Sequence, residues 1–196
     1  MPARRPERAM SGNTGSDDEE IITACLQGDR DRFSVLVDRY KGLVYSVAYR
    51  LTGDQDKAND AAQECFISAY IHLCDFRFGS KFSTWLYTIV LNKCRDQLRQ
   101  EKDMLSVDDI AAVRPSEAPD PEQEAVRREV RDDIQRALDA LPPDYREVLV
   151  LKHIQGLEFQ EISRIAGASV SALKVRAHRG RELLRAVMEK AGMNHG

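Results

Sequence analysis

Apolar residues recur every three or four positions along almost the whole chain, and the alternation of polar and β-branched residues typical of strands is absent. This pattern predicts an all-α protein. A first, short helix can be capped by Asp17 or Asp18 and ends near Gly28. A second helix starts at Asp29 and stops at residues 52–54, where a glycine and a capping aspartate end it and start the next helix.

Two further helices follow in the first hundred residues. The third breaks around residues 76–80, and the fourth opens near Ser83 or Thr84. The second and third helices each have a continuous apolar stripe at helical spacing, which should face the core. These stripes comprise Phe33, Leu36, Val37, Tyr40, Val44, Val47, Ala48 and Leu51 in the second helix, and Ala58, Ala61, Ala62, Cys65, Phe66, Ala69, Tyr70 and Leu73 in the third.

The helical pattern fails from about residue 100 to residue 121, where Pro115, Pro119 and Pro121 stand among acidic and small residues. This composition is typical of a flexible linker. The chain is therefore expected to fold as two small helical domains. The expected boundaries are a disordered tail at residues 1–16, a first domain at 17–100, a linker at 101–121 and a second domain at 122–196.

The second domain starts with a clean helical stripe that residues 142–143, both proline, bring to an end. The stripe comprises Val126, Val130, Ile134, Leu138 and Leu141. Asp144 is expected to cap the next helix. Two short helices then flank a tight turn at residues 167–168, with apolar positions on both sides of it. This arrangement predicts a helix-turn-helix, whose second helix lies in the major groove of DNA.

A net charge of −3 does not by itself indicate a nucleic-acid-binding protein, but the charge is unevenly distributed. Residues 17–20 are all acidic, whereas the last predicted helix is strongly basic. Its cations occupy more than one face, so some are expected to reach bases and others phosphates. The candidate DNA contacts there are Ser169, Ser171, Lys174, Arg176, His178, Arg179 and Arg181. The alternative is an ordinary solvated basic helix face.

Aromatic and basic residues are interleaved between Phe76 and Arg99. Aromatic rings beside cations suit unpaired bases, because each stacked base contributes roughly 1–3 kcal/mol while the cations follow the backbone. The alternative is that Trp85, and still more so Phe76, belongs to the core.

The four cysteines, Cys25, Cys65, Cys74 and Cys94, lie far apart without a paired motif, which argues against zinc, haem and a disulfide framework. Buried thiols are expected, with redox sensing as the alternative. No apolar run reaches the roughly 18 residues that a membrane span requires, and residues 1–16 carry no complete export signal, so a cytoplasmic protein is expected. The chain also has no glycine-rich phosphate loop, no nucleophile elbow and no paired histidines, which argues against an enzyme and against any metal or cofactor.

Two segments resemble a known family. Residues 60–70 (DAAQECFISAY) and 82–87 (FSTWLY) closely resemble the second conserved region of extracytoplasmic-function sigma factors. Residues 141–148 (LPPDYREV) through 176–181 (RAHRGR) resemble their fourth region. The order and separation of the segments, with a proline-bearing linker between them, also match, and the resemblance extends over roughly residues 20–190.

The resemblance implies a subunit that lends promoter recognition to RNA polymerase. The third helix would dock on the clamp of the polymerase large subunit through Asp60, Gln63, Glu64, Phe66 and Tyr70. The following segment would melt and read the −10 element through Phe78, Lys81, Phe82, Ser83, Thr84, Trp85, Asn92, Arg95 and Arg99. The last helix would read the duplex −35 element through the seven candidates above, and its domain would bind the polymerase flap. An anti-sigma factor is the expected inhibitor.

The chain departs from the family pattern in its last helix, where Ala172 replaces a frequent threonine and Val175 a frequent serine. These changes leave the expected fold intact but affect the phosphate contacts and the base preference. A plain helix-turn-helix regulator, which usually binds a two-fold operator as a dimer, is the alternative function. The motif at residues 60–87 argues against it.

Overall fold

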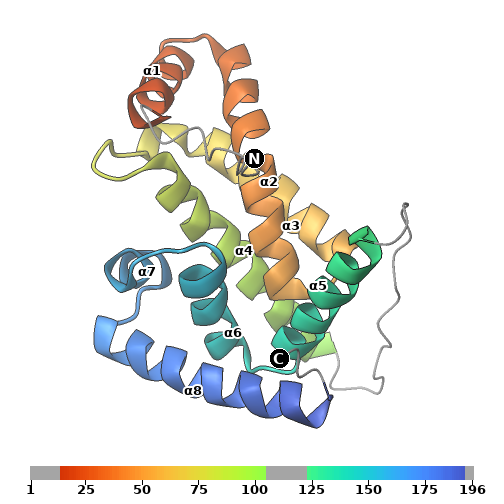
Figure 1. Ribbon diagram of the computed structural model, residues 1–196. Helices are drawn as coiled ribbons and strands as arrows, with labels where there is room; N and C mark the ends of the chain where they lie inside the picture. Colours follow the sequence, from red (N-terminus) through yellow and green to blue (C-terminus); the bar gives the residue numbers. More distant parts are fainter. Residues whose placement is uncertain (1–13, 105–122, 193–196) are drawn as a thin grey trace, which may run out of the picture.

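The computed structural model describes residues 14–104 and 123–192, and all the regular elements in these ranges are helices (Figure 1). The predicted all-α class and the two helical domains are confirmed. The predicted tail lies outside the described residues except for its last three positions, which begin a helix, and the predicted linker lies outside them from residue 105 onward. None of the described helices is both long and apolar enough to cross a membrane.

The first domain packs four α-helices and two short 3₁₀ turns. They are α1 (Thr14–Leu26), η1 (Arg30–Arg32), α2 (Phe33–Thr52), α3 (Gln55–Ile71), η2 (Leu73–Asp75) and α4 (Phe82–Met104). Gly53 ends α2 in the left-handed conformation, and Asp54 caps α3 by accepting a hydrogen bond from the Lys57 backbone N–H. The predicted caps at Asp17 and Asp18 are wrong, because α1 already begins at Thr14 and both residues lie inside it.

The predicted apolar stripes form most of this domain's core. Six of the eight expected positions in α2 are buried, and Val37 and Tyr40 are half-buried. In α3 and η2, Ala58, Ala61, Cys65, Ala69 and Leu73 are buried, Ala62 and Phe66 are half-buried, and Tyr70 is exposed at the edge of the stripe. Small side chains on α3 let it pack closely between α2 and α4.

The second domain contains α5 (Gln123–Asp139), α6 (Pro143–Leu149), the single π-helical turn η3 (Val150–Ile154), α7 (Phe159–Ala166) and α8 (Val170–Lys190). Pro143 occupies the first position of α6, where its missing N–H costs nothing. The predicted cap at Asp144 is wrong, because this residue lies in the first turn of α6. The helix-turn-helix is confirmed: α7 ends at Gly167 in the left-handed conformation, and α8 follows three residues later.

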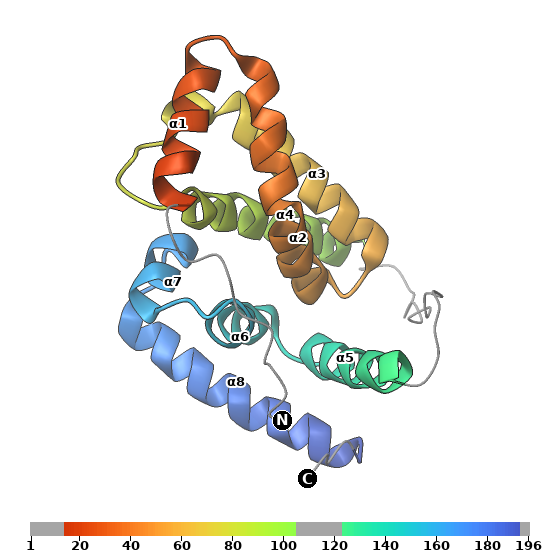
Figure 2. The same cartoon turned by 45° about the horizontal axis from the view of Figure 1, so that its top comes forward.

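The two domains contact each other directly (Figures 1 and 2): α7 lies against α4, and the C-terminal end of α2 lies against α5 and α6. Arg146 of α6 donates a 2.7 Å hydrogen bond to the Leu51 carbonyl, one of the terminal carbonyls that α2 itself cannot satisfy. At Gly53, where φ is +72°, a Cβ would lie 2.6 Å from Oδ1 of Asp139 in α5, so a larger residue would be strained and would require the Asp139 side chain to move.

Candidate nucleic-acid interface

The N-terminus of α8 presents two exposed hydroxyl side chains. Ser169 Oγ caps the helix by accepting a 3.2 Å hydrogen bond from the Ala172 backbone N–H, and it lies 3.1 Å from Ser171 Oγ. The cap holds Ser169 in place, while Ser171 projects from the first turn into a groove between the domains. Hydroxyls at a helix N-terminus, where backbone N–H groups also point outward, are well placed for phosphate oxygens.

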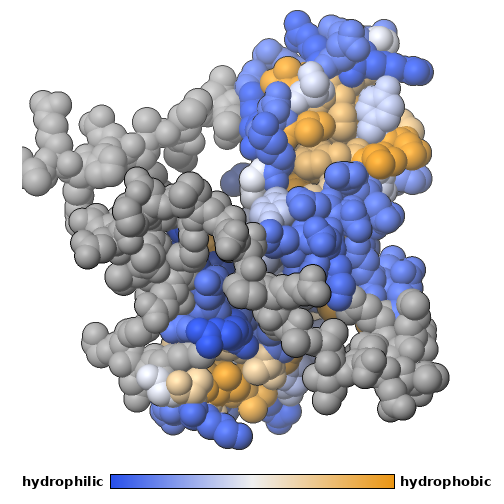
Figure 3. Space-filling model, turned by 90° about the vertical axis from the view of Figure 1, so that its right-hand side faces the viewer, coloured by the Kyte–Doolittle hydropathy of each residue, from blue (hydrophilic) through white to orange (hydrophobic). Residues whose placement is uncertain are grey.

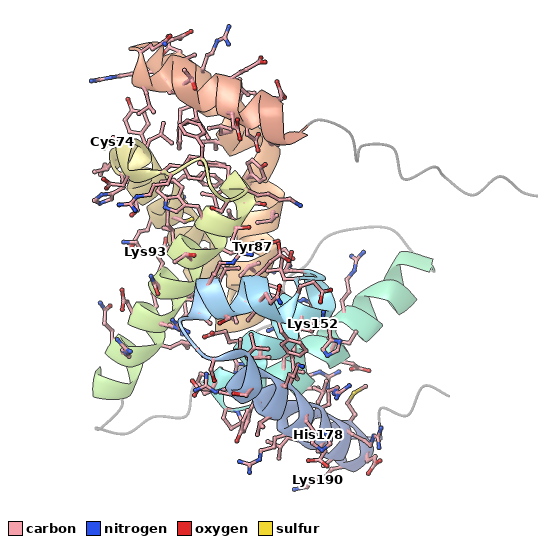
Figure 4. All side chains as sticks on the ribbon, turned by 90° about the vertical axis from the view of Figure 1, so that its left-hand side faces the viewer. Cys74, Tyr87, Lys93, Lys152, His178 and Lys190 are labelled. Carbon is pink, nitrogen blue, oxygen red and sulfur yellow. The ribbon has the colours of Figure 1, made fainter. Side chains whose placement is uncertain are left out.

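The basic side chains of α8 divide between two faces. Ser171, Val175 and Arg179 follow one another at helical spacing and line the groove. Lys174, His178 and Arg181 form a second, exposed row. Figure 4 shows His178 on this helix, where its Nε2 lies 3.6 Å from the carboxylate of Glu182 one turn away. The expectation that these cations do not share one face therefore agrees with their placement.

The two departures from the family pattern both line the groove but differ in exposure. Ala172 is half-buried, whereas Val175 is 51% exposed. An exposed apolar side chain on a helix that enters the major groove can contact the methyl group of thymine. At position 175, valine can therefore contact a thymine methyl group, whereas the serine that is frequent in the family can form a hydrogen bond.

The aromatic residues around the start of α4 form a connected cluster. The ring of Phe76 lies 5.6 Å from that of Phe82 and 5.5 Å from that of Trp85, in tilted or edge-on geometries. Phe82 is only 2% exposed and Thr84 is also buried, so little of either side chain is open to solvent. Phe78, by contrast, is 47% exposed and packs edge-on against Phe76.

A small pocket of about 230 Å³ lies between α1 and the loop before α4. The exposed ring of Phe78, Lys81 and the buried carboxylate of Asp18 line it. Asp18 accepts hydrogen bonds from Arg39 and from the Tyr40 hydroxyl, which hold α1 against α2. The sequence pattern did not identify this contribution of α1, because an acidic block gives no sign of where it folds back.

The remaining candidates on α4 follow its length. Ser83 is half-buried, and Asn92 and Arg99 are exposed. Arg95 contacts the second domain: its guanidinium donates hydrogen bonds of 3.0 and 2.7 Å to the two carboxylate oxygens of Glu147. Burial raises the pKa of Glu147, and the guanidinium of Arg95 opposes that rise.

The outward face of α3 combines acidic, amide and apolar side chains. Asp60, Gln63 and Glu64 are exposed, and Glu64 lies 3.3 Å from Lys93 of α4, which Figure 4 labels. Phe66 is half-buried, and the ring of Tyr70 packs edge-on against Phe33 at 5.1 Å while remaining partly exposed. These five predicted residues therefore lie on the outward face and one flank of the same helix.

Two apolar residues on that face were not among the predicted site residues. Ile67 and Ile71 are 59% and 64% exposed, one turn apart, and fall in line with Asp60 and Glu64. Figure 3 shows exposed apolar side chains over the first domain. Ile67 and Ile71 lie outside the buried apolar stripe of α3, and their positions could have been noticed in the sequence. Two isoleucines on the polar side of an amphipathic helix indicate a contact surface.

The cysteines differ in exposure. Cys25, Cys65 and Cys94 are buried, as expected, whereas Cys74 in η2 is exposed. Burial raises the pKa of both the Cys65 and the Cys94 thiol to about 12. The thiolate is the reactive form, so these two cysteines are inert at neutral pH.

We therefore expect a neutral-pH thiol reagent such as DTNB to modify one cysteine rapidly in the native protein and all four after denaturation. A Cys74→Ser variant should lose the fast phase and keep the other three thiols protected. Rapid native modification of this variant would show that the buried thiols open readily to solvent.

Comparison with known proteins finds two family matches in this order. Residues 36–103 match the family model described as Sigma-70 region 2, and residues 131–184 match the model described as Sigma-70, region 4. The chain is 39% identical over 173 residues to the ECF RNA polymerase sigma factor SigW of Bacillus subtilis, covering 84% of this chain and 92% of that protein. It is 34% identical over 181 residues to SigE of Mycolicibacterium smegmatis, covering 88% and 70%.

Solved structures show the same fold. CnrH in complex with the cytosolic domain of CnrY matches with a TM-score of 0.65 at 28% identity, covering 88% of this chain and 97% of CnrH. RpoE in complex with the anti-sigma factor NepR from Bartonella quintana also matches with a TM-score of 0.65, at 23% identity, covering 80% and 96%. The second match bears on the fold alone.

Proposed function

This chain belongs to the sigma-70 family, among its extracytoplasmic-function members, and we propose that it binds core RNA polymerase and directs it to specific promoters. The observation that carries the proposal is the pairing, in one chain, of an aromatic and basic surface on α4 with a basic recognition helix, α8, on a second domain. One surface suits unpaired bases and the other suits duplex DNA.

Run-off transcription with purified core polymerase tests this function. The protein should produce discrete transcripts from a subset of genomic fragments, and core polymerase alone should not. DNA binding without any association with polymerase would favour the helix-turn-helix regulator instead.

For the −10 element, we propose that the exposed Phe78 and Lys81 receive an unpaired base at the small pocket beside α1. Phe82 and Trp85 would support that surface as members of the aromatic cluster, and Thr84 would support it from the edge of the cluster. Phe82 and Thr84 are assigned this supporting role because both are buried. Asn92, Arg95, Arg99 and Ser83 would follow the strand along α4. Flipping a base costs a few kcal/mol, which stacking on Phe78 can offset.

For the −35 element, we propose that Ser171, Val175 and Arg179 face base edges, with Arg176 beside them. Ser169, Lys174, His178 and Arg181 would contact phosphates on either side, since they flank this row. The second domain would also hold the polymerase flap.

For polymerase binding, we propose the outward face of α3, with Ile67 and Ile71 added to the five predicted residues. An amphipathic helix face of this kind suits a helical partner such as the polymerase clamp.

Reversing the charge of Asp60 tests this surface. Asp60→Arg should weaken association with core polymerase by at least about tenfold, because the exposed side chain would meet the partner with the wrong charge, while its exposure spares the fold. Glu189→Arg makes the same charge change at the far end of α8 and should bind core normally. Equal binding by both variants would exclude this face of α3, and association is measured by gel filtration or fluorescence anisotropy.

We also propose that an anti-sigma factor controls the protein, since the similar CnrH structure holds a partner protein, the cytosolic domain of CnrY. The protein itself is not an enzyme in this proposal, because catalysis belongs to the polymerase, and it acts in the cytoplasm where that polymerase is found. The proposed domain boundaries remain residues 17–100 and 122–196, with α4 continuing to Met104.

A further inference from the structure

Helix α1 forms one wall of the small pocket to which the proposed function assigns an unpaired −10 base. Asp18, Glu19 and Ile22 of this helix line the pocket. The loop before α4, which carries Phe78 and Lys81, lines it as well, and Figures 1 and 2 both show α1 beside this loop. The width of the pocket therefore depends on where α1 lies relative to the loop.

The two halves of α1 are anchored in different ways. The second half has an apolar face, on which Ile21, Ile22 and Cys25 are buried in the core. In the first half, Asp18 is the one buried residue among residues 17–20. A buried carboxylate needs partners that replace the water it has lost. The first half of α1, which borders the pocket, is therefore held by polar contacts.

The carboxylate of Asp18 has two partners on α2. Its Oδ1 accepts a hydrogen bond from the guanidinium of Arg39, and its Oδ2 accepts one from the hydroxyl of Tyr40. Burial and the hydrogen bond to Asp18 raise the pKa of the Tyr40 hydroxyl, which therefore stays protonated as a donor at neutral pH. Because hydrogen bonds are directional, these contacts fix the rotation of α1 as well as its distance from α2.

Tyr40 also supports the aromatic side of the pocket. Its ring packs edge-on against that of Phe82, with 5.5 Å between the ring centroids. Phe82 lines the pocket together with Phe76, on which it packs in turn. In the described part of the chain, the residues that line the pocket do not include Tyr40. One side chain therefore joins the α1 wall to the aromatic residues without itself lining the pocket.

We propose that Tyr40 and Asp18 are positioning residues for the −10 base, because their hydrogen bond sets the spacing between α1 and the aromatic residues that receive it. The proposal rests on the proposed function for the identity of the ligand. A flipped base offsets the cost of its unstacking only through close contacts in the pocket, so a small shift of α1 reduces its capture. Contacts with the rest of the strand do not depend on this spacing.

Tyr40→Phe, in holoenzyme reconstituted from core polymerase and the full chain, tests the proposal. This substitution removes the hydroxyl that donates to Asp18, keeps the ring that packs on Phe82 and changes no charge. The probes are single-stranded oligonucleotides of the −10 element, either intact or with one abasic site, and fluorescence anisotropy measures their binding. Placing the abasic site at each position in turn with wild-type holoenzyme identifies the captured base.

The readout is the ratio of affinities for the intact oligonucleotide and the one that lacks the captured base. Wild-type holoenzyme should prefer the intact strand roughly tenfold, since stacking and edge contacts hold the base. Tyr40→Phe should lower this ratio roughly fivefold, because α1 loses one of its anchors. A general loss of folding would weaken both oligonucleotides equally and leave the ratio unchanged.

Tyr45→Phe is the matched control. It makes the same substitution in the same helix, at a half-buried tyrosine that stacks on Tyr49 instead. It should keep the ratio within about twofold of the wild type. An equal fall in both variants, or a full ratio for Tyr40→Phe, would overturn the proposal.

Asp18→Asn supplies a second test that needs neither polymerase nor DNA. The substitution keeps the size of the side chain and removes the charge that pairs with Arg39. In the full chain it should speed the hydrogen exchange of the α1 backbone amides several-fold relative to those of α2. Unchanged exchange would show that Asp18 does not hold α1, and would overturn the proposal.

The outcomes also separate this proposal from the proposed function. Equal binding of intact and abasic strands by wild-type holoenzyme, at every position, would overturn the −10 pocket and this proposal with it. A wild-type preference that Tyr40→Phe and Asp18→Asn both retain would overturn this proposal alone.

Discussion

Replacing Arg179 with alanine is expected to reduce transcription from a cognate promoter roughly 5- to 160-fold, corresponding to about 1–3 kcal/mol of lost base recognition. Arg179 is exposed and lies on the row of α8 that lines the groove, two turns from Ser171. A long guanidinium at that position can reach a guanine edge with two hydrogen bonds. Run-off transcription with reconstituted polymerase measures the loss.

The loss should depend on promoter sequence. Against a panel of −35 variants, Arg179→Ala should lose its preference at one base pair and retain it at the others. Arg185→Ala removes the same charge farther along the exposed side of α8, and it should weaken binding only slightly and equally for all sequences. A uniform loss for Arg179→Ala, with a salt dependence reduced by about one ion, would reassign this residue to phosphate.

The helices and most of their inner faces could be predicted from the sequence because their spacing is local. The stripe from Phe33 to Leu51 in α2 needed only the helical period, and Gly53 followed by Asp54 marked a helix end and a new start. Caps were less predictable. Asp17, Asp18 and Asp144 all had the right chemistry, but acidic residues suit the first turn of a helix as well as the cap, and all three lie inside helices.

The contact between the domains could not be predicted, because it joins residues far apart in sequence that no periodic pattern relates. Arg95 and Glu147 are separated by 52 positions, and Leu51 and Arg146 by 95. A composition that indicates a flexible linker says nothing about whether the bodies it joins also contact each other. The candidate DNA residues were found by chemical type, so buried Phe82 and Thr84 were grouped with exposed Phe78. Only the packing of the folded chain shows which of these side chains are buried and which are exposed.

The helix-turn-helix core should be the most sensitive part of the second domain to truncation. Leu173 of α8 is fully buried, as is Ile162 of α7 across the turn. Leu173→Ala should lower the free energy of unfolding by roughly 2–5 kcal/mol, because it removes apolar contacts and leaves a cavity. Domains are stable by only about 5–15 kcal/mol in total, so this single substitution should remove a large share of the stability of the second domain.

Leu183→Ala supplies the matched comparison, since it makes the same substitution in the same helix at a side chain that is 41% exposed. Alanine is the better helix former, so intrinsic propensity cannot explain a loss at either position. Urea denaturation followed by circular dichroism should show Leu183→Ala within about 1 kcal/mol of the wild type and Leu173→Ala well below both. Similar midpoints for the two variants would mean that α7 and α8 do not pack through Leu173, and the position of the recognition helix would then lack its support.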